Sequence, residues 1–220
     1  MTVLIYIQKG KIMMAYSMEI IHKDEQNTSE WAGGTTTQLA IHPKNSEYKE
    51  RTFSWRLSSA RVDLEESVFT SLPGIFRHIM VLEGEMKLIH EGHHTALLRP
   101  FEKDSFSGSW MTKSIGKVRD FNLMLGNGCK GELEALLADE GIDLDTQAFA
   151  CDKAFANVTQ GFYCVDGNAD ILTGSGNRTR LTPGDLLLIS YPSEEKCPDI
   201  RLEPCCEKTA AVVRAGILHK

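Results

Sequence analysis

The 220-residue sequence predicts an all-β protein made of two tandem antiparallel β-barrels joined by a short helix. Three observations support this fold class. Short segments with period-two alternation of apolar and polar residues recur along the chain, glycine or Pro-Gly turns separate them, and similar strand-and-turn spacings occur in both halves. A chain of 220 residues suits two small domains whose cores need no disulfide or metal ion.

The clearest alternation in the first half places polar side chains together on strand faces. The segment around residue 56 alternates polar with aromatic and aliphatic residues, so Arg56 and Ser58 share one face. In the segment 118–125, Asp120 and Asn122 share a face and apolar residues occupy the other. We expect both polar faces to point toward the interior of the first barrel.

A hairpin is predicted between residues 86 and 98, with a turn at Glu91-Gly92. Gly92 supplies the positive φ that a two-residue turn favours. Such a turn would pair His90 with His93, and we expect these imidazoles to be solvated on an exposed hairpin.

Residues 131–141 interrupt the strand pattern with helix-forming residues, a leucine stripe and a terminal glycine, which predicts a short amphipathic helix. This helix divides the chain. The predicted organisation is an N-terminal extension at 1–17, a first barrel at 18–128, a linking helix at 129–146 and a second, smaller barrel at 147–220.

The two strand-rich stretches have similar spacings of Gly, Leu, Thr and Pro, at residues 81–100 and 165–183. The second stretch ends in Thr182-Pro183-Gly184-Asp185, which predicts a corner that carries the chain from one sheet to the other. A strand, a Pro-Gly-Asp corner and a buried strand after a glycine-rich hairpin resemble the cupin fold.

Charge and cysteine content exclude several classes of protein. The chain has 24 basic and 30 acidic residues, a net charge of −6, and no dense Lys/Arg cluster, so we expect no nucleic-acid or membrane partner. All 6 cysteines lie between Cys129 and Cys206 without a CxxC motif, which indicates reduced thiols rather than disulfides or a zinc site. The apolar stretch 3–7 is too short for a signal segment, so we expect a cytoplasmic protein.

Six motifs in the first half occur in a fixed order and identify a family resemblance. They are WAGGTTTQL (31–39), FSWRLSSA (53–60), FTSLPGIFR (69–77), LEG (82–84), FSG (106–108) and VRDFNLM (118–124). This series resembles the HutD/Ves family, bicupin proteins with an RmlC-like jelly-roll fold associated with histidine utilisation. The resemblance implies binding of a small histidine-pathway metabolite such as formylglutamate, with no assigned catalysis. The sequence departs from the family pattern at Gln38, Phe76 and Ser109.

The metal-ligand motif of cupins, Gly-x5-His-x-His followed by a glutamate, is incomplete in this sequence. Gly74 is followed by His78 and then Glu83, with no second histidine at the required spacing. The sequence therefore predicts neither a metal site nor a cofactor.

The candidate ligand-binding residues are polar groups on the strand faces of the first barrel. Guanidinium groups pair bidentately with carboxylates, so two arginines and an amide suit a small anionic metabolite. The predicted ligand-binding residues are Thr36, Arg56, Ser58, Arg77 and Asn122. The same arginines would also suit a buried ion-pair network with Asp120 or Glu83 that only fixes the fold.

Two enzymatic alternatives remain open at this stage. One is a metal-independent isomerase or lyase acting on a small carboxylate, with Asp120 or Glu83 as general base. The other is a metal-dependent dioxygenase, which requires bound iron or nickel. The sequence assigns no catalytic residue otherwise, and it leaves the oligomeric state open between a monomer and a homodimer paired through sheet edges.

Overall fold

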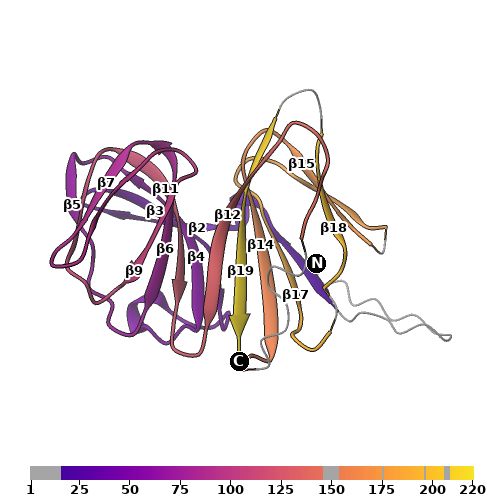
Figure 1. Cartoon of the computed structure of the whole chain (residues 1–220), viewed down its shortest axis with the longest axis horizontal. Coiled ribbons are helices and arrows are strands. Elements are labelled where there is room, and N and C mark those ends of the chain that lie inside the picture. Colours follow the sequence, from indigo (N-terminus) through magenta and orange to yellow (C-terminus); the bar gives the residue numbers. More distant parts are fainter. Residues whose placement is uncertain (1–15, 146–153, 175, 196, 206–208) are drawn as a thin grey trace. The chain divides into compact units, whose positions relative to one another are not determined.

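In the computed structural model, the chain folds almost entirely into β-strands (Figure 1). Contacts divide it into two units, which we call the central unit (residues 26–133) and the terminal unit (residues 1–25 and 134–220). The structure describes residues 16–145, 154–174, 176–195, 197–205 and 209–220.

The central unit consists of two antiparallel sheets rather than one closed barrel. The larger sheet has the strand order β2-β3-β4-β11-β6-β9, and the smaller has the order β5-β10-β7-β8. The strands are β2 (Asn27–Trp31), β3 (Gly34–His42), β4 (Trp55–Val62), β5 (Glu66–Val68), β6 (Phe76–Gly84), β7 (Met86–His90), β8 (Thr95–Leu98), β9 (Lys103–Ser107), β10 (Thr112–Ile115) and β11 (Val118–Leu125). A one-turn helix, η2 (Tyr48–Glu50), lies between β3 and β4.

The period-two alternation of the first half is confirmed. The strand β11 has the predicted bounds and lies between β4 and β6, with Asn122 beside Ser58 on one side and Ile79 on the other. Ile79 packs with Met86 of the smaller sheet in the buried core of the unit. Directly paired residues share a face, so Asn122 and Ser58 also face the space between the two sheets.

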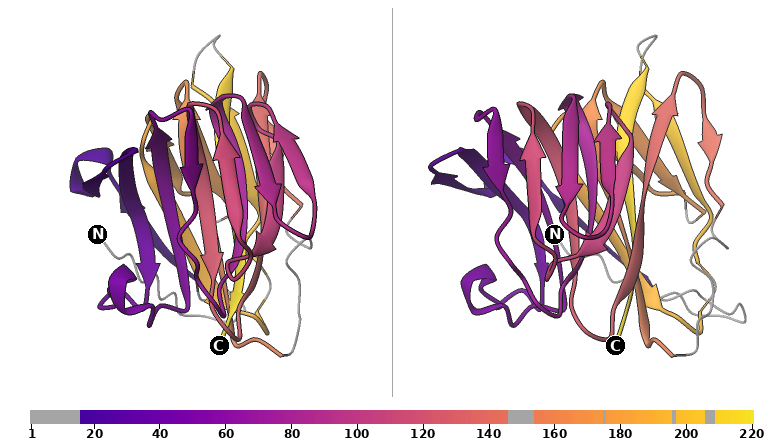
Figure 2. Two further views of the ribbon diagram at one scale, coloured as in Figure 1. Left: turned by 90° about the vertical axis from the view of Figure 1, so that its left-hand side faces the viewer. Right: turned by 60° about the vertical axis from the view of Figure 1, so that its left-hand side comes forward.

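The terminal unit has the same two-sheet construction. Its larger sheet has the order β1-β17-β14-β19-β12, and its smaller sheet has the order β13-β18-β15-β16. The turned views in Figure 2 follow these strands from two other sides. The elements are β1 (Ser17–Ile21), η1 (Lys23–Glu25), β12 (Lys130–Ala138), β13 (Ile142–Asp143), β14 (Asn157–Asp166), β15 (Ala169–Thr173), β16 (Arg178–Leu181), β17 (Leu186–Pro192), β18 (Ile200–Pro204) and β19 (Ala210–His219).

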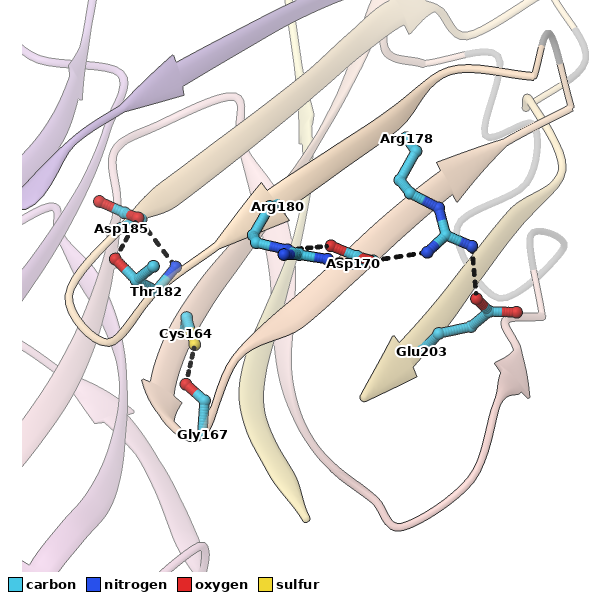
Figure 3. A network of polar contacts seen from close by, with 8 residues as sticks. All are labelled: Cys164, Gly167, Asp170, Arg178, Arg180, Thr182, Asp185 and Glu203. Carbon is cyan, nitrogen blue, oxygen red and sulfur yellow. Dashed lines mark hydrogen bonds and ion pairs between the residues drawn. The ribbon is translucent and has the colours of Figure 1, made fainter. Parts of the chain in front are cut away.

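The predicted Pro-Gly-Asp corner is confirmed in the terminal unit. It joins β16 of the smaller sheet to β17 of the larger one, so the chain changes sheet there. The Asp185 carboxylate accepts hydrogen bonds from Thr182 N at 2.9 Å and Thr182 Oγ1 at 2.8 Å, which holds the corner closed (Figure 3). Gly184 provides the positive φ, +102°, that the bend requires.

The predicted helix at 131–141 is wrong, because residues 130–138 form β12. This strand occupies the edge of the five-stranded sheet next to β19. From residue 136 onward the burial alternates as in a strand, since Leu136 and Ala138 are buried while Leu137 between them is exposed. Pairing with β19 overrides the weak helix propensity of the segment.

The predicted internal repeat is confirmed at the level of topology. In each unit, two strands pair in the larger sheet and the two strands between them in sequence pair in the smaller sheet. The central unit does this with β6 and β9 around β7 and β8, and the terminal unit with β14 and β17 around β15 and β16. In the terminal unit β12 lies beside β19, in the position that β4 takes beside β11 in the central unit. The repeat therefore requires residues 130–138 to form a strand.

The contacts divide the chain at positions other than the predicted domain boundaries. Residues 17–21 form β1, which pairs with β17 of the terminal unit, and the central unit begins at Gln26. Most of the predicted extension at 1–17 lies outside the described residues.

Within the described residues, no helix is both long and apolar enough to span a bilayer. Four cysteines in this part of the chain are free thiols; Cys164 and Cys197 are buried, and Cys129 and Cys205 are half-buried. Cys151 and Cys206 lie outside the described residues.

Candidate functional site

Two buried arginines lie in one row across the larger sheet of the central unit. Arg56 on β4 and Arg77 on β6 both pair with Met124 of the intervening strand β11. Their Cα atoms are therefore about 10 Å apart, two strand spacings. Both side chains face the interior, and the residues are only 5% and 4% exposed.

The guanidinium of Arg56 is held by neutral partners. Its Nε donates to Gln38 Oε1 at 2.9 Å, and its Nη1 donates to Ser58 Oγ at 3.0 Å. The centroid of the half-buried Tyr48 ring, on the one-turn helix η2, lies 4.4 Å from the guanidinium carbon. No carboxylate in the described residues pairs with Arg56, so its charge is oriented but not neutralised.

The guanidinium of Arg77 has aromatic neighbours and lacks polar partners. It lies over the rings of Phe69 and Phe106, at 4.6 and 5.2 Å from the two centroids. Within the described residues it makes no hydrogen bond or ion pair, and its Nε is fully buried. The pKa of Arg77 is lowered to about 10, chiefly by burial and also by the nearby charge of Arg56, although Tyr48 and Asp120 act in the opposite direction.

Asp120 and Asn122 line the same interior face on β11. Asp120 Oδ1 and Asn122 Oδ1 are buried, and the described residues provide neither atom with a hydrogen-bond partner. Burial raises the pKa of Asp120 to about 7, even though the Arg77 charge favours the carboxylate. A buried polar group without a partner costs free energy, so three such atoms on one face need an explanation. We call Arg56, Ser58, Arg77, Asp120 and Asn122 the interior polar cluster.

Two other sequence candidates lie away from this cluster. Thr36 pairs with Ala60, which places it on the same face of the sheet as the two arginines. The structure shows no contact between Thr36 and either arginine. Glu83 is exposed at the end of β6, where its Oε1 forms an ion pair with Arg119 Nη2 at 2.7 Å and it lines a groove with Arg61 and Lys117. The proposed pairing of Glu83 with Arg56 or Arg77 is therefore wrong.

The terminal unit also contains a buried arginine, and this one is fully satisfied. Arg214 on β19 donates from Nε and Nη2 to Gln160 Oε1, at 2.9 and 2.7 Å. It also donates from Nη2 to Asp145 O at 3.0 Å and from Nη1 to Glu134 Oε2 at 3.2 Å. The sequence analysis did not single out Arg214, because its partners come from three distant segments.

A second polar network of the terminal unit is equally self-contained (Figure 3). The buried carboxylate of Asp170 accepts hydrogen bonds from Arg178 at 2.8 Å and from Arg180 at 3.0 Å, and Arg178 also reaches Glu203. The hydrogen bond from Arg180 lowers the pKa of Asp170. Every charge in this network has a partner within the protein, so it is structural.

Several residues that contact the interior polar cluster were missed by sequence reasoning. Gln38 was noted only as a departure from a family pattern, and Tyr48, Phe69 and Phe106 were not considered as site residues. The three aromatic residues come from the helix η2, the loop between β5 and β6, and the strand β9. No local pattern in the sequence indicates that these segments meet the arginines. Gln38 lies on β3 opposite Ser58, so the alternation of β3 was the one available signal.

Comparisons with solved structures identify proteins of the same fold. A conserved protein of unknown function, PA5104 from Pseudomonas aeruginosa, aligns with a TM-score of 0.74 at 23% identity, covering 91% of this chain and 98% of that one. HutD from Pseudomonas fluorescens SBW25 aligns with a TM-score of 0.63 at 20% identity, covering 90% and 97%. A mutant of the Bacillus subtilis oxalate decarboxylase aligns at 0.58 and 7% identity, covering 94% and 78%. The fold is therefore all-β and cupin-like.

Sequence comparisons identify the family. A curated relative from Pseudomonas putida, an uncharacterized 21.2 kDa protein in the hutC 3' region, is 42% identical over 77 residues. That match covers 33% of this chain and spans 40% of the relative. The HutD family model matches residues 23–204, most of the chain, and the chain therefore belongs to the HutD family.

Proposed function

We propose that the protein binds a small carboxylate metabolite in the central unit, where Arg56 and Arg77 hold the anion and Ser58 and Asn122 complete the site. The observation that carries this proposal is the contrast between two buried arginines. Arg214 is surrounded by protein acceptors, whereas Arg77 has none among the described residues. A carboxylate would supply the acceptor that Arg77 lacks, in the bidentate geometry that a guanidinium favours.

Family membership narrows the choice of ligand. The HutD family links the chain to histidine utilisation, and the Pseudomonas putida relative is described by its position next to hutC. We propose a metabolite of histidine breakdown, of the formylglutamate type, as the ligand. In this proposal the protein is a cytoplasmic tandem cupin that modulates histidine catabolism, and Thr36 is a peripheral ligand contact.

The experiment is a calorimetric titration and thermal-shift series with formylglutamate, glutamate and urocanate, with glutamine as a control that lacks the side-chain carboxylate. We expect saturable binding of one carboxylate. At a ligand concentration one hundred times Kd, binding should stabilise the folded protein by about 2.7 kcal/mol. Arg77→Met should abolish the shift, and Arg77→Lys should retain part of it, because lysine keeps the charge but loses the planar fork.

Arg61→Gln is the matched control, because Arg61 is exposed and its side chain forms a surface ion pair with Asp63. This variant should bind the ligand as the wild type does. Failure of all three carboxylates to bind the wild-type protein would overturn the histidine-pathway proposal. Binding that survives both Arg77→Met and Arg56→Met would show that the ligand lies elsewhere.

A metal-independent isomerase or lyase is the second candidate, and the state of Asp120 favours it. A carboxyl group with a pKa of about 7, buried beside an arginine, is suited to take up and release a proton at neutral pH. Turnover of any bound metabolite that is lost in Asp120→Asn would establish this function. Saturable binding without turnover would exclude it for the metabolites tested.

A further inference from the structure

Two histidines and an aspartate converge at the end of the hairpin in the central unit. His90 lies at the end of β7, His94 lies just before β8, and Asp104 is on β9. His90 Nε2 is 2.9 Å from Asp104 Oδ2, and His94 Nε2 is 3.0 Å from the same oxygen. One ligand atom from each of the three side chains lies within 4.8 Å of the others.

The turn geometry brings these two imidazoles together, and it corrects the hairpin prediction. Strand β8 begins at Thr95 rather than at residue 93, and His90 N donates to His94 O at 2.9 Å. The loop therefore has three residues, with Gly92 at φ +77°. His94 is opposite His90, and the predicted pairing of His90 with His93 is wrong.

The burial of His90 also differs from the prediction of a solvated imidazole. Its side chain is 0% exposed, whereas that of His94 is 41% exposed. The His90 ring contacts Phe106, with centroids 4.5 Å apart, and burial lowers its pKa. The His90 ring is therefore held in the packed interior of the unit rather than solvated on the hairpin.

An outer contact fixes the orientation of the His90 ring. Its Nδ1 is 2.8 Å from Thr112 Oγ1, and Thr112 Oγ1 in turn donates to Trp110 O at 3.4 Å. This chain leaves Nε2 directed at Asp104. A hydrogen-bonded second nitrogen is the usual support of a metal-ligating histidine, because it selects the tautomer and holds the ring.

We propose that His90, His94 and Asp104 bind a divalent first-row transition-metal ion of the zinc class. Two imidazoles and one carboxylate form a ligand set suited to zinc. Tetrahedral coordination with bonds near 2.0 Å needs ligand atoms about 3.3 Å apart, so the observed separations require only small movements. Three protein ligands fill three of the four tetrahedral positions. His94 and Asp104 are partly exposed, so the fourth position is open to solvent or to a small molecule.

His93 provides an internal control beside the site. Its ring stacks on Trp110, with centroids 3.7 Å apart, and it is not one of the three converging residues. His93→Phe keeps an aromatic ring on Trp110 and removes both ring nitrogens. If the histidine-rich hairpin bound metal ions without a defined site, this variant would weaken binding as much as a ligand variant does.

The test uses the full-length protein without a histidine tag, stripped with a chelator and titrated with Zn²⁺ by calorimetry and with Co²⁺ by visible absorption. We expect one metal ion per chain and the d–d bands of a four- or five-coordinate site. His94→Gln and Asp104→Asn should each weaken binding at least about a hundredfold, and Thr112→Val about ten- to a hundredfold. His93→Phe should bind as the wild type does.

His94 and Asp104 are chosen because their side chains are partly exposed and their replacement should not affect folding, which the melting temperature in chelator would verify. The absence of stoichiometric binding by the wild-type protein would overturn the proposal. Binding unchanged in both ligand variants, or lost equally in His93→Phe, would also overturn it. The three residues are separate from the proposed carboxylate contacts, so either proposal can fail while the other stands.

Discussion

Asp120 is a carboxyl group held inside the central unit with its pKa raised to about 7, chiefly by burial. The positive charge of Arg77 and a hydrogen bond from the backbone of Ala60 act in the opposite direction and lower this pKa. The charged state of Asp120 is therefore set by the balance between lost hydration and these two favourable interactions. This balance makes stability depend on pH in a direction opposite to that of most carboxylates.

We expect Asp120→Asn to stabilise the protein at neutral and alkaline pH. The unfolded chain releases this proton near pH 4 and the folded protein near pH 7, so the folded state binds more protons between these values. The contribution of Asp120 to the free energy of unfolding therefore falls as pH rises from about 4 to 7, by at most about 4 kcal/mol. Urea unfolding at pH 4.5 and pH 8 would measure it. An equal difference between the two proteins at both pH values would contradict the assignment.

The two buried arginines should respond in opposite ways to replacement. Arg77→Met removes a charge that has no hydrogen-bonding partner in the described structure, so we expect the unliganded variant to be at least as stable as the wild type. Arg214→Met leaves Gln160 and Glu134 without their donor and should cost about 3–5 kcal/mol. Chemical denaturation of both variants distinguishes a binding residue from a structural one. Strong destabilisation by Arg77→Met would assign Arg77 a structural role.

At the scale of the element, turns determine which side chains meet. The loop after β7 places His94 opposite His90, and a turn shorter by one residue would have brought His93 there instead. The corner at Thr182–Asp185 similarly carries the chain between sheets through one carboxylate and one glycine. Both features depend on a glycine with positive φ, but the glycines of this chain differ in how closely they are packed.

We expect Gly84→Ala to be more destabilising than Gly92→Ala. Both residues have positive φ, +85° and +77°, which alone costs an alanine about 1–2 kcal/mol. A Cβ atom at residue 84 would lie 2.4 Å from Lys117 O, whereas at residue 92 it would meet no atom within 4 Å. Thermal denaturation of the two variants would measure the difference. Equal losses of stability would show that the backbone around residue 84 moves to relieve the contact.

At the scale of the whole molecule, the chain does not follow a simple order of one unit after the other. Strand β1 comes first in the described sequence but pairs with β17, more than 160 residues later, as in the register of Ile20 with Leu187. Ile20 and Met18 also pack against the buried core of the terminal unit. The terminal unit therefore needs both ends of the chain.

A chain truncated to begin at Gln26 should lose protection from amide exchange in the terminal unit and keep it in the central unit. Removal of β1 exposes the edge of β17, so we expect faster amide exchange at residues 186–190 and a weakened terminal unit. Exchange in β6 and β11 of the central unit should be unchanged. Hydrogen–deuterium exchange with peptide resolution would measure both regions in one experiment. Uniform loss of protection in both units would show that they fold as one cooperative body.

Local patterns predicted the strands well where one face is polar and the other apolar. Strand β11 has the predicted bounds, and its alternation correctly places Asp120 and Asn122 on one face. The linking helix failed, because leucine spacing in a short segment fits a strand or a helix, and pairing with β19 decides between them. Helix propensities of a few tenths of a kcal/mol per residue are too small to oppose hydrogen bonding to a neighbouring strand.

The sequence by itself determined the all-β class, the repeated strand pattern, the Pro-Gly-Asp corner and the family. These depend on residues near one another in the chain, whose backbone preferences and periodicity act locally. Only the tertiary structure decided which charges are compensated. Among the described residues it provides no acceptor for Arg77, surrounds Arg214 with acceptors, and brings Asp104 to His90 and His94. Compensation depends on the strands that lie side by side after folding, and no local spacing in the sequence contains that information.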